Sequence, residues 1–320
     1  MNNTNTEKKT LEEILKDSLT SMKLSKKAFK GVDIDINTVS SIKKMVSFYY
    51  MIQDNRVRVS NQKYALDQEE DGGNDIFMAF FKDQMCQTEN NIATFLDVWT
   101  DRNPIGKWAK SNTGIGPVIA AGLVARFDVK KTQTAGGFWA YAGIARGMDE
   151  RAERKRGEVA KYSPETKVLV WKASSSFKMQ STRDNCYYGK LYREKKAEYL
   201  TRNDDGGFRK NAEYELSVKK IGTDTDAYKA YIEGKLPLAH IDAMAMRYAG
   251  KIFISHLFDV MYMYEYGEMP PVPYPIAYIN GHTHILHPQN LEVILPYLKV
   301  KFPDKDWKSM INNHYKRELI

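Results

Sequence analysis

Hydrophobic residues recur along most of the chain with the spacing of α-helices. One series at intervals of three or four comprises Val39, Ile42, Val46, Tyr49 and Ile52. After the acidic break QEEDGGND, a second series comprises Met78, Phe81, Met85, Thr88, Ile92, Phe95 and Trp99. Such spacing predicts two long helices joined at a Gly-Gly hinge, forming a helical hairpin. The heptad seam requires a partner helix, either in this chain or in a second copy.

Shorter helical patterns occupy most of the remaining chain. They predict a helix around residues 11–24, helices over PIGKWAK and PVIAAGLVARF, one beginning near Ser163-Pro164, a lysine-rich one from Tyr187 and two short C-terminal helices. Between the lysine-rich helix and the C-terminal helices, a polar spacer leads to the longest and most apolar helix. This helix covers residues 237–267 and is terminated by Gly267 and the following prolines. Alternating strand patterns are almost absent. We therefore predict an all-α fold.

These helices divide the chain into four predicted parts. Residues 1–36 form a polar N-terminal segment, and residues 37–102 form the long helical hairpin. A helix-hairpin-helix unit with a basic loop covers residues 103–182. The C-terminal region, residues 183–320, is a helical bundle with a loop rich in Pro and His at 268–289.

Composition indicates a folded protein. Of 320 residues, 42% are hydrophobic and 12% aromatic, enough for substantial cores. The chain has no apolar run of about 18 residues, and its N-terminus lacks the apolar core of a secretion signal, so we expect a cytoplasmic protein without a membrane partner. The two cysteines lack a neighbouring Cys or His at ligand spacing and predict neither a disulfide nor a zinc site.

The positive charge is concentrated in one region. Residues 126–220 contain 22 Lys and Arg against 13 Asp and Glu, a local charge of +9, whereas the whole chain carries +8. Such a region is typical of a surface that binds a polyanion, and a solvated lysine-rich surface is the alternative.

The stretch SNTGIGPVIAAGLVARF predicts a specific phosphate site. A short helix, a Gly-Ile-Gly turn and a helix opened by Pro117 form the pattern of a helix-hairpin-helix, with Ile115 filling the core beneath the turn. We expect Gly114 and Gly116 to adopt dihedrals closed to other residues and to let backbone N–H groups approach a ligand. The start of the next helix adds unpaired N–H groups and a positive dipole end. A tight structural turn is the alternative.

The predicted DNA-binding residues surround this turn and continue into the basic region. Binding through phosphates should be independent of sequence and sensitive to salt. The set comprises Lys107, Lys110, Thr113, Gly114, Ile115, Gly116, Pro117, Arg126, Lys130, Lys131, Arg151, Arg154, Lys155, Arg156, Lys190, Arg193, Arg247 and Lys251. Tyr187, Tyr188 and Tyr192 interleave with basic residues, as on single-strand binding surfaces, although core packing of the tyrosines is the alternative.

The segments GIGPVIAAGLVARFD and TAGGFWAYAGI, followed by a basic loop and a helix, resemble a known family. Residues 103–180 look like the C-terminal helix-hairpin-helix half of insertion-sequence transposases related to the Piv and MooV DNA invertases. Other stretches, including YGKLYREKKAEY and PPVPYPIAYINGHTH, resemble stand-alone relatives from phages and mobile elements. The resemblance implies DNA recombination or transposition, and it adds structured RNA as an alternative partner.

The chain departs from that family where the family performs catalysis. Full transposases carry a ribonuclease-H-like domain with four acidic metal ligands. In this chain, the segment with Asp33 and Asp35 is similar to the first catalytic strand of that domain, but no further strands follow to complete its sheet. The family also has a serine nucleophile in the loop after the AYAGI-like segment, and this chain has no Ser between residues 145 and 157. The resemblance therefore implies binding without the family's catalytic groups.

A nonstandard catalytic site is the alternative. Either a nucleophile, Ser163 or Tyr188, or the acids Asp149 and Glu153 would carry out the chemistry. Only this alternative would involve Mg²⁺; otherwise we expect no cofactor. His282, His284 and His287 form the main His cluster, with a spacing that could bind a divalent metal. We predict a DNA-binding protein that dimerises through its N-terminal helices. An active recombinase or nuclease, and a purely structural interaction protein, remain as alternatives.

Overall fold

The computed structural model describes residues 10–32, 34–35, 38–68, 76–145, 157, 159–272 and 285–315. These residues form α-helices, short 3-10 helices and connecting turns, and no strand occurs among them. The prediction of an all-α fold is confirmed.

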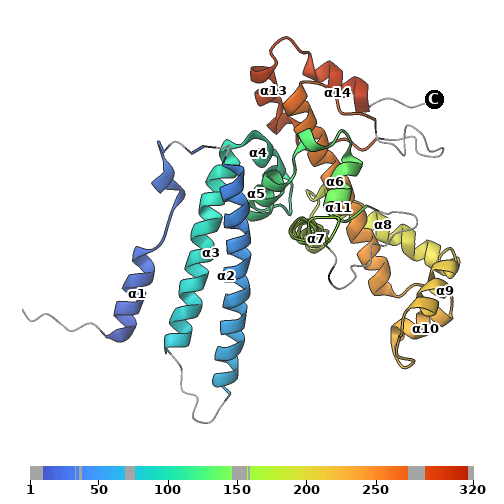
Figure 1. Ribbon diagram of the computed structural model, residues 1–320, viewed down its shortest axis with the longest axis horizontal. Helices are drawn as coiled ribbons and strands as arrows, with labels where there is room; N and C mark the ends of the chain where they lie inside the picture. The colour runs from blue at the N-terminus through green and yellow to red at the C-terminus, as the bar shows by residue number, and fades with distance from the viewer. Residues whose placement is uncertain are drawn as a thin grey trace, which may run out of the picture.

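The predicted helical hairpin consists of α2 (Val39–Leu66) and α3 (Ile76–Arg102), which lie side by side (Figure 1). We call this pair the long hairpin. Ile42, Val46 and Trp99 are buried at its root, and Arg56 Nε donates to Glu89 Oε1 at 2.5 Å farther along. The heptad seam of α3 therefore finds a partner helix within the same chain.

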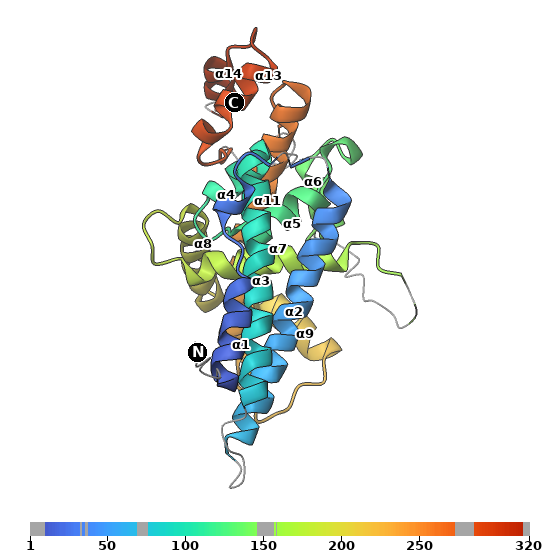
Figure 2. The ribbon, with the colours of Figure 1, turned by 90° about the vertical axis from the view of Figure 1, so that its left-hand side faces the viewer.

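The N-terminal segment runs along the long hairpin. It contains α1 (Leu11–Ser21), close to the helix expected over 11–24, and the 3-10 helix η1 (Lys26–Phe29). Asn91 of α3 holds it, donating from Nδ2 to Met22 O and accepting from Leu24 N. Figure 2 shows α1 against α3.

At the root of the long hairpin lies a second, short hairpin, α4 (Pro104–Ser111) and α5 (Pro117–Arg126). Helix α5 packs against α2, α3, α4 and α7 (Pro164–Met179). Its small residues permit this. A Cβ atom on Gly122 would lie 2.8 Å from Leu169 Cδ1 of α7 and 3.1 Å from Val46 Cγ1 of α2.

The second half of the chain is organised around the predicted long apolar helix, α11 (Leu238–Tyr266). It contacts α6 (Ala135–Tyr141), α7 and α8 (Tyr187–Asp204), as well as the 3-10 helix η2 (Val129–Lys131). It ends at Gly267, which has a φ of 69°. Beyond that end lie η3 (Leu291–Val293), α13 (Leu295–Lys301) and α14 (Trp307–Tyr315), the two last being the expected C-terminal helices.

The segment before α11 is not a mere polar spacer, which corrects the sequence prediction. It contains α9 (Arg209–Val218) and α10 (Asp226–Ile232). A small separate core holds them to α11, comprising Phe208, Ala212, Tyr231, Leu236, Ile241 and Met244. At α9 the inward positions Phe208, Ala212 and Leu216 do recur every four residues, but this short series stands among charged and polar residues and gives only a weak helical signal.

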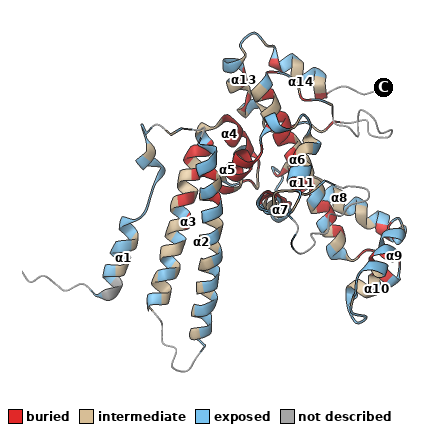
Figure 3. Ribbon diagram, in the orientation of Figure 1, coloured by how far each residue is buried: buried red, intermediate tan, exposed pale blue. Residues whose placement is uncertain are grey.

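One main core joins the parts that the sequence separates. It contains residues of the long-hairpin root, of α4 to α8, of α11 and of α13 and α14. Figure 3 shows buried residues concentrated where these helices meet, while the far end of the long hairpin is largely exposed. Among the described helices, none is long and apolar enough to cross a membrane.

The crossing of α7 and α8 supplies a test of this packing. A Cβ atom on Gly189 would lie 2.7 Å from Ser181 Cα and 2.9 Å from Phe177 O, backbone atoms that cannot rotate away. We expect Gly189→Ala to lower the free energy of unfolding by about 2 kcal/mol in urea denaturation, despite the better helix propensity of Ala. Gly136→Ala in α6 is the control, because its Cβ atom would meet only Thr134 Oγ1, at 3.6 Å. Equal effects of the two variants would contradict the packing.

Candidate nucleic-acid interface

The turn between α4 and α5, residues 112–116, is held from several sides. Helix α4 begins with Asn103, whose Oδ1 accepts from Gly106 N at 2.9 Å, and ends at Asn112, whose Nδ2 donates to Trp108 O at 2.9 Å. Ile115 is 4% exposed, so it fills the core beneath the turn as predicted. The sequence thus folds locally into the expected helix-hairpin-helix geometry.

The two glycines of the turn have different roles. Gly114 has a φ of +100°, and a Cβ atom there would lie 3.0 Å from Phe177 Cδ1. Gly116 has a φ of −83°, open to every residue, and a Cβ atom there would meet nothing within 4 Å. The expectation that both need special dihedrals is therefore correct for Gly114 and wrong for Gly116. The fold does not require glycine at 116.

Gly116 instead leaves the start of α5 uncovered. It is the N-cap residue and has no side chain to accept a hydrogen bond, and Pro117 occupies the first helical position. The N–H groups of Gly116, Val118 and Ile119 have no acceptor among the described residues. Unpaired N–H groups and the helix dipole together favour an anion at this end.

A groove of ≈ 390 Å³ reaches this helix end. We call it the α5 groove. It lies between the α1–η1 connection, helix α3 and Pro117, and its lining comprises Lys23, Leu24, Gln87, Asn90, Ala93, Thr94, Asp97 and Pro117. Polar and apolar atoms contribute about equally to its surface, so a charged ligand can keep part of its solvation along the polar part.

A cluster of paired charges borders the α5 groove. Lys26 and Lys110 each contact both Asp97 and Asp101, with Lys110 Nζ 2.5 Å from Asp101 Oδ1. Burial acts to raise the pKa of Asp101, but the hydrogen bonds from Lys110 and Lys26 outweigh it and leave that pKa below its ordinary value. Lys110, predicted to contact DNA, therefore neutralises carboxylates next to the groove and helps to fix α4 on α3.

Several predicted phosphate ligands are engaged within the protein. Arg126 is the clearest correction, since its side chain is 4% exposed and binds Glu165 and Ser47. Lys130 pairs with Glu265 at 2.8 Å, and Lys107 donates to Tyr297 Oη at 3.2 Å. From the sequence alone, an arginine in the last turn of a helix is expected to be exposed. Its carboxylate partner, Glu165, is too far along the chain to be recognised there.

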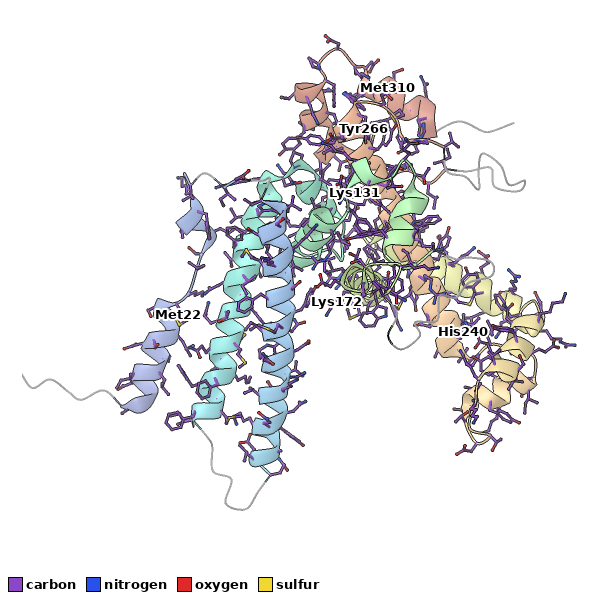
Figure 4. All side chains as sticks on the ribbon, in the orientation of Figure 1. Met22, Lys131, Lys172, His240, Tyr266 and Met310 are labelled. Carbon is purple, nitrogen blue, oxygen red and sulfur yellow. The ribbon has the colours of Figure 1, made fainter. Side chains whose placement is uncertain are left out.

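Other predicted ligands remain on the surface. Lys131, labelled in Figure 4, has a side chain that is 82% exposed, and the side chain of Lys190 is 64% exposed. Of the two DNA ligands predicted on α11, Arg247 is exposed, whereas Lys251 is partly buried with its Nζ 4.8 Å from the centre of the Trp139 ring. The basic region is thus only partly available to a polyanion.

The far side of the turn carries an arginine that the sequence analysis missed. Cys186 Sγ donates to Thr113 O at 3.5 Å, and burial raises the pKa of the Cys186 thiol while the charges of Arg183 and Arg193 act to lower it. Both arginines are exposed. Arg193 was predicted as a DNA ligand. Arg183 was not, because it stands in a short connection with no periodic or motif signal.

The two described candidate nucleophiles have structural hydrogen bonds. Ser163 caps α7, with its Oγ accepting from Thr166 N at 3.2 Å. Tyr188 is 1% exposed, its Oη lies 2.8 Å from His256 Nδ1, and burial raises its pKa well above the ordinary value. Tyr192 is also buried. These tyrosines belong to the core, so the alternative of core packing is confirmed for them.

The remaining candidates lie outside the described residues. These are Asp33, Asp149, Arg151, Glu153, Arg154, Lys155, Arg156, His282 and His284. His287 is described, and its Nδ1 lies 3.0 Å from Pro288 O. No group of three or more His, Cys, Asp or Glu side chains suited to a metal occurs in the part of the chain that the structure describes.

Comparisons with known protein families, with curated proteins and with solved structures found no match.

The buried carboxyl group of Asp259 predicts how the stability of the protein depends on pH. Tyr315 Oη donates to Asp259 Oδ2 at 3.1 Å, tying α14 to α11. Burial raises the pKa of Asp259 to about 7, against roughly 3.9 in an unfolded chain. Between these values the folded state holds more protons, so the free energy of unfolding falls as pH rises.

We expect this contribution to fall by about 2 kcal/mol between pH 5 and pH 7. Asp259→Asn removes the titration, so urea denaturation at both pH values should show that the stability of the variant relative to wild type increases with pH. The comparison of variant with wild type cancels the contribution of His256, because both proteins contain this buried ring, whose pKa is lowered to about 3. A constant difference between the two proteins would contradict the assignment.

Proposed function

We propose that this chain is a DNA-binding protein that holds backbone phosphates at the short hairpin α4–α5. The observation that carries the proposal is the uncapped N-terminus of α5, where N–H groups without acceptors adjoin the exposed Gly116 and the α5 groove. Phosphate oxygens accept such N–H groups well, and the helix dipole adds to the attraction. Because these contacts reach phosphates, binding should not depend on base sequence.

Positive charges on both sides of the turn support this proposal. Lys23 lines the α5 groove, and the exposed Arg183 and Arg193 lie near Cys186, which itself contacts Thr113. A phosphodiester chain that follows these groups would release counterions, so its affinity should fall steeply with salt. We propose binding as the activity, because the described nucleophile candidates Ser163 and Tyr188 are held in structural hydrogen bonds.

The resemblance of residues 103–180 to invertase-related transposases supports the biological setting. On that basis we propose a cytoplasmic role in recombination, transposition or replication of DNA in a phage or mobile element. Structured RNA shares the same backbone phosphates and is the second polyanion to test against this site.

We also propose that the long hairpin binds a second copy of the chain. Its surface carries large apolar side chains that the protein does not cover, including Phe48 (45% exposed), Met51 (50%), Tyr64 (69%) and Phe81 (47%). Exposed apolar groups gathered on one element are typical of an interaction surface. A second copy presents the same apolar face, so the two faces can cover each other.

Replacement of Gly116 by Asp tests the phosphate site. Asp is a good N-cap residue and fits the observed dihedrals, so the variant should be as stable as wild type, or more stable by a few tenths of a kcal/mol. Its carboxylate would occupy the N–H groups and repel a phosphate. We expect affinity for a duplex oligonucleotide to fall about tenfold or more, measured by fluorescence anisotropy at low salt.

The control is Gly136→Asp, which adds the same charge at an exposed glycine near the start of α6. It should weaken binding by less than about twofold, because Gly136 does not line the α5 groove and an exposed charge outside the site contributes little. Equal losses of affinity in the two variants would mean that the added negative charge, and not its position at α5, weakens binding. Unchanged affinity in Gly116→Asp would remove the basis of the proposed site.

The second copy is tested by the mass of the protein in solution. Phe48→Glu together with Met51→Glu places charges on the exposed face of α2 and should convert a dimer to a monomer in light scattering coupled to size exclusion. Val218→Glu is the control, since Val218 is 54% exposed on α9. A monomeric wild-type protein at concentrations of about 100 μM, well above a typical dimer Kd, would refute the dimer.

A further inference from the structure

A second, smaller cavity adjoins the turn of the short hairpin at its other end. Asn112 and Thr113 line it, whereas Pro117 lines the α5 groove, so the turn separates the two. The cavity has a volume of ≈ 70 Å³, and three segments distant in sequence contribute to it. Besides Asn112 and Thr113, its lining comprises Asn185, Tyr187, Tyr188, Gln289 and Asn290. We call it the amide pocket.

Hydrogen bonds fix the orientation of three of these amides. The Nδ2 of Asn112 donates to Trp108 O, the Nε2 of Gln289 to His287 O, and the Nδ2 of Asn290 to Ser111 O. Because each NH₂ group faces a backbone carbonyl, each amide oxygen is left on the opposite branch. No hydrogen bond within the described chain uses these three oxygens. Three of the residues that line the pocket therefore carry an acceptor without a donor from the protein.

The same reasoning applies to Tyr188. His256 Nε2 lies 2.9 Å from Leu286 O, a carbonyl that can only accept, so Nε2 carries the ring proton. His256 Nδ1 is then the acceptor for the hydroxyl of Tyr188, 2.8 Å away. The hydroxyl of Tyr188 is thus engaged with His256 in the core, and Tyr188 contributes a fixed wall to the pocket.

Charge and shape limit the ligand further. None of the seven lining residues carries a formal charge, so a cation would lose its solvation without a counter-charge. A neutral group with several N–H donors suits the pocket better. The half-buried ring of Tyr187 supplies an aromatic surface beside these acceptors, as stacking sites for bases do.

We propose that the amide pocket takes the amino-bearing edge of an unpaired nucleobase. The exocyclic amines of cytosine, adenine and guanine each present two N–H donors to fixed oxygens, whereas uracil and thymine present a carbonyl oxygen at the matching position. The small volume admits the edge of a base while the rest of the ring stays outside. In a paired duplex this edge is already occupied, so the base must be unpaired.

The inference rests on the proposed function in one respect, because Asn112 and Thr113 belong to the turn that would hold the backbone. It also narrows that function to a substrate class. DNA with unpaired nucleotides, such as a single strand or a branched junction, could place a phosphate at α5 and a neighbouring base in the amide pocket. A fully paired duplex could use only the phosphate site.

Free nucleosides test the pocket without involving phosphate. Cytidine and uridine differ at the amine that the pocket would bind, so they form a matched pair. We expect cytidine, added at millimolar concentration, to give saturation-transfer NMR signals that titrate, with uridine about threefold to tenfold weaker, the loss expected for one unmade hydrogen bond. Asn185→Ala and Gln289→Ala should each weaken cytidine binding by a similar factor.

Asn211→Ala removes an exposed amide on α9, far from the pocket in sequence, and serves as the control that should leave cytidine binding unchanged. Equal binding of cytidine and uridine, or equal binding by wild type and the pocket variants, would overturn the proposal. No nucleoside binding together with normal duplex binding would overturn the pocket alone. Nucleoside binding without any oligonucleotide binding would retain the pocket and reject the phosphate site.

Discussion

The burial of α5 is the constraint on which the rest of the structure depends. Residues 120–127 are all buried, because α2, α3, α4 and α7 cover this helix. Small side chains at Ala120, Ala121 and Gly122 allow that close approach, and the neighbours could not be moved outward without opening cavities in the main core. A helix enclosed along its length can meet a ligand only at an end.

The N-terminus of α5 is the end that remains accessible, at the exposed Gly116 of the turn before it. Gly114 is needed for the backbone to reverse under Phe177, and Ile115 anchors the turn in the core. Gly116 has neither task, and its lack of a side chain leaves the N–H groups at the start of α5 uncovered. The neighbouring helices then determine what can approach. Helix α3 and the α1–η1 connection line the α5 groove on one side of the turn, and the start of α8 with residues 289–290 lines the amide pocket on the other.

The sequence predicts the helices well, because their signals are local. Period, the cap at Ser163, the proline at 117 and the glycine at 267 each act within one or two turns of the chain. The α9–α10 segment escaped prediction because its inward apolar residues, such as Phe208 and Tyr231, are few and stand among charged and polar residues. The helix-hairpin-helix geometry was predictable for the same reason that the helices were, since its glycines, apolar residue and proline are contiguous.

The site was only partly predictable, because its chemistry depends on partners far apart in sequence. Arg126 resembles a surface arginine until Glu165 is placed beside it, and Lys110 until Asp97 and Asp101 are. The amide pocket requires Asn112, Asn185 and Gln289 to meet, and single amides in loops carry no pattern. Arg183 becomes a candidate phosphate ligand only through its position in space, near Cys186 and the turn.

The most direct test of the central claim follows the backbone N–H groups themselves. Protein labelled with ¹⁵N in Gly, Val and Ile would be titrated with a short DNA duplex in transverse-relaxation-optimised NMR. If phosphate binds at the uncapped start of α5, the largest shifts will occur at Gly116, Val118 and Ile119, and they will vanish at high salt. Shifts that spare these three amides while the DNA binds elsewhere would show that α5 is only a core helix and its turn only structural.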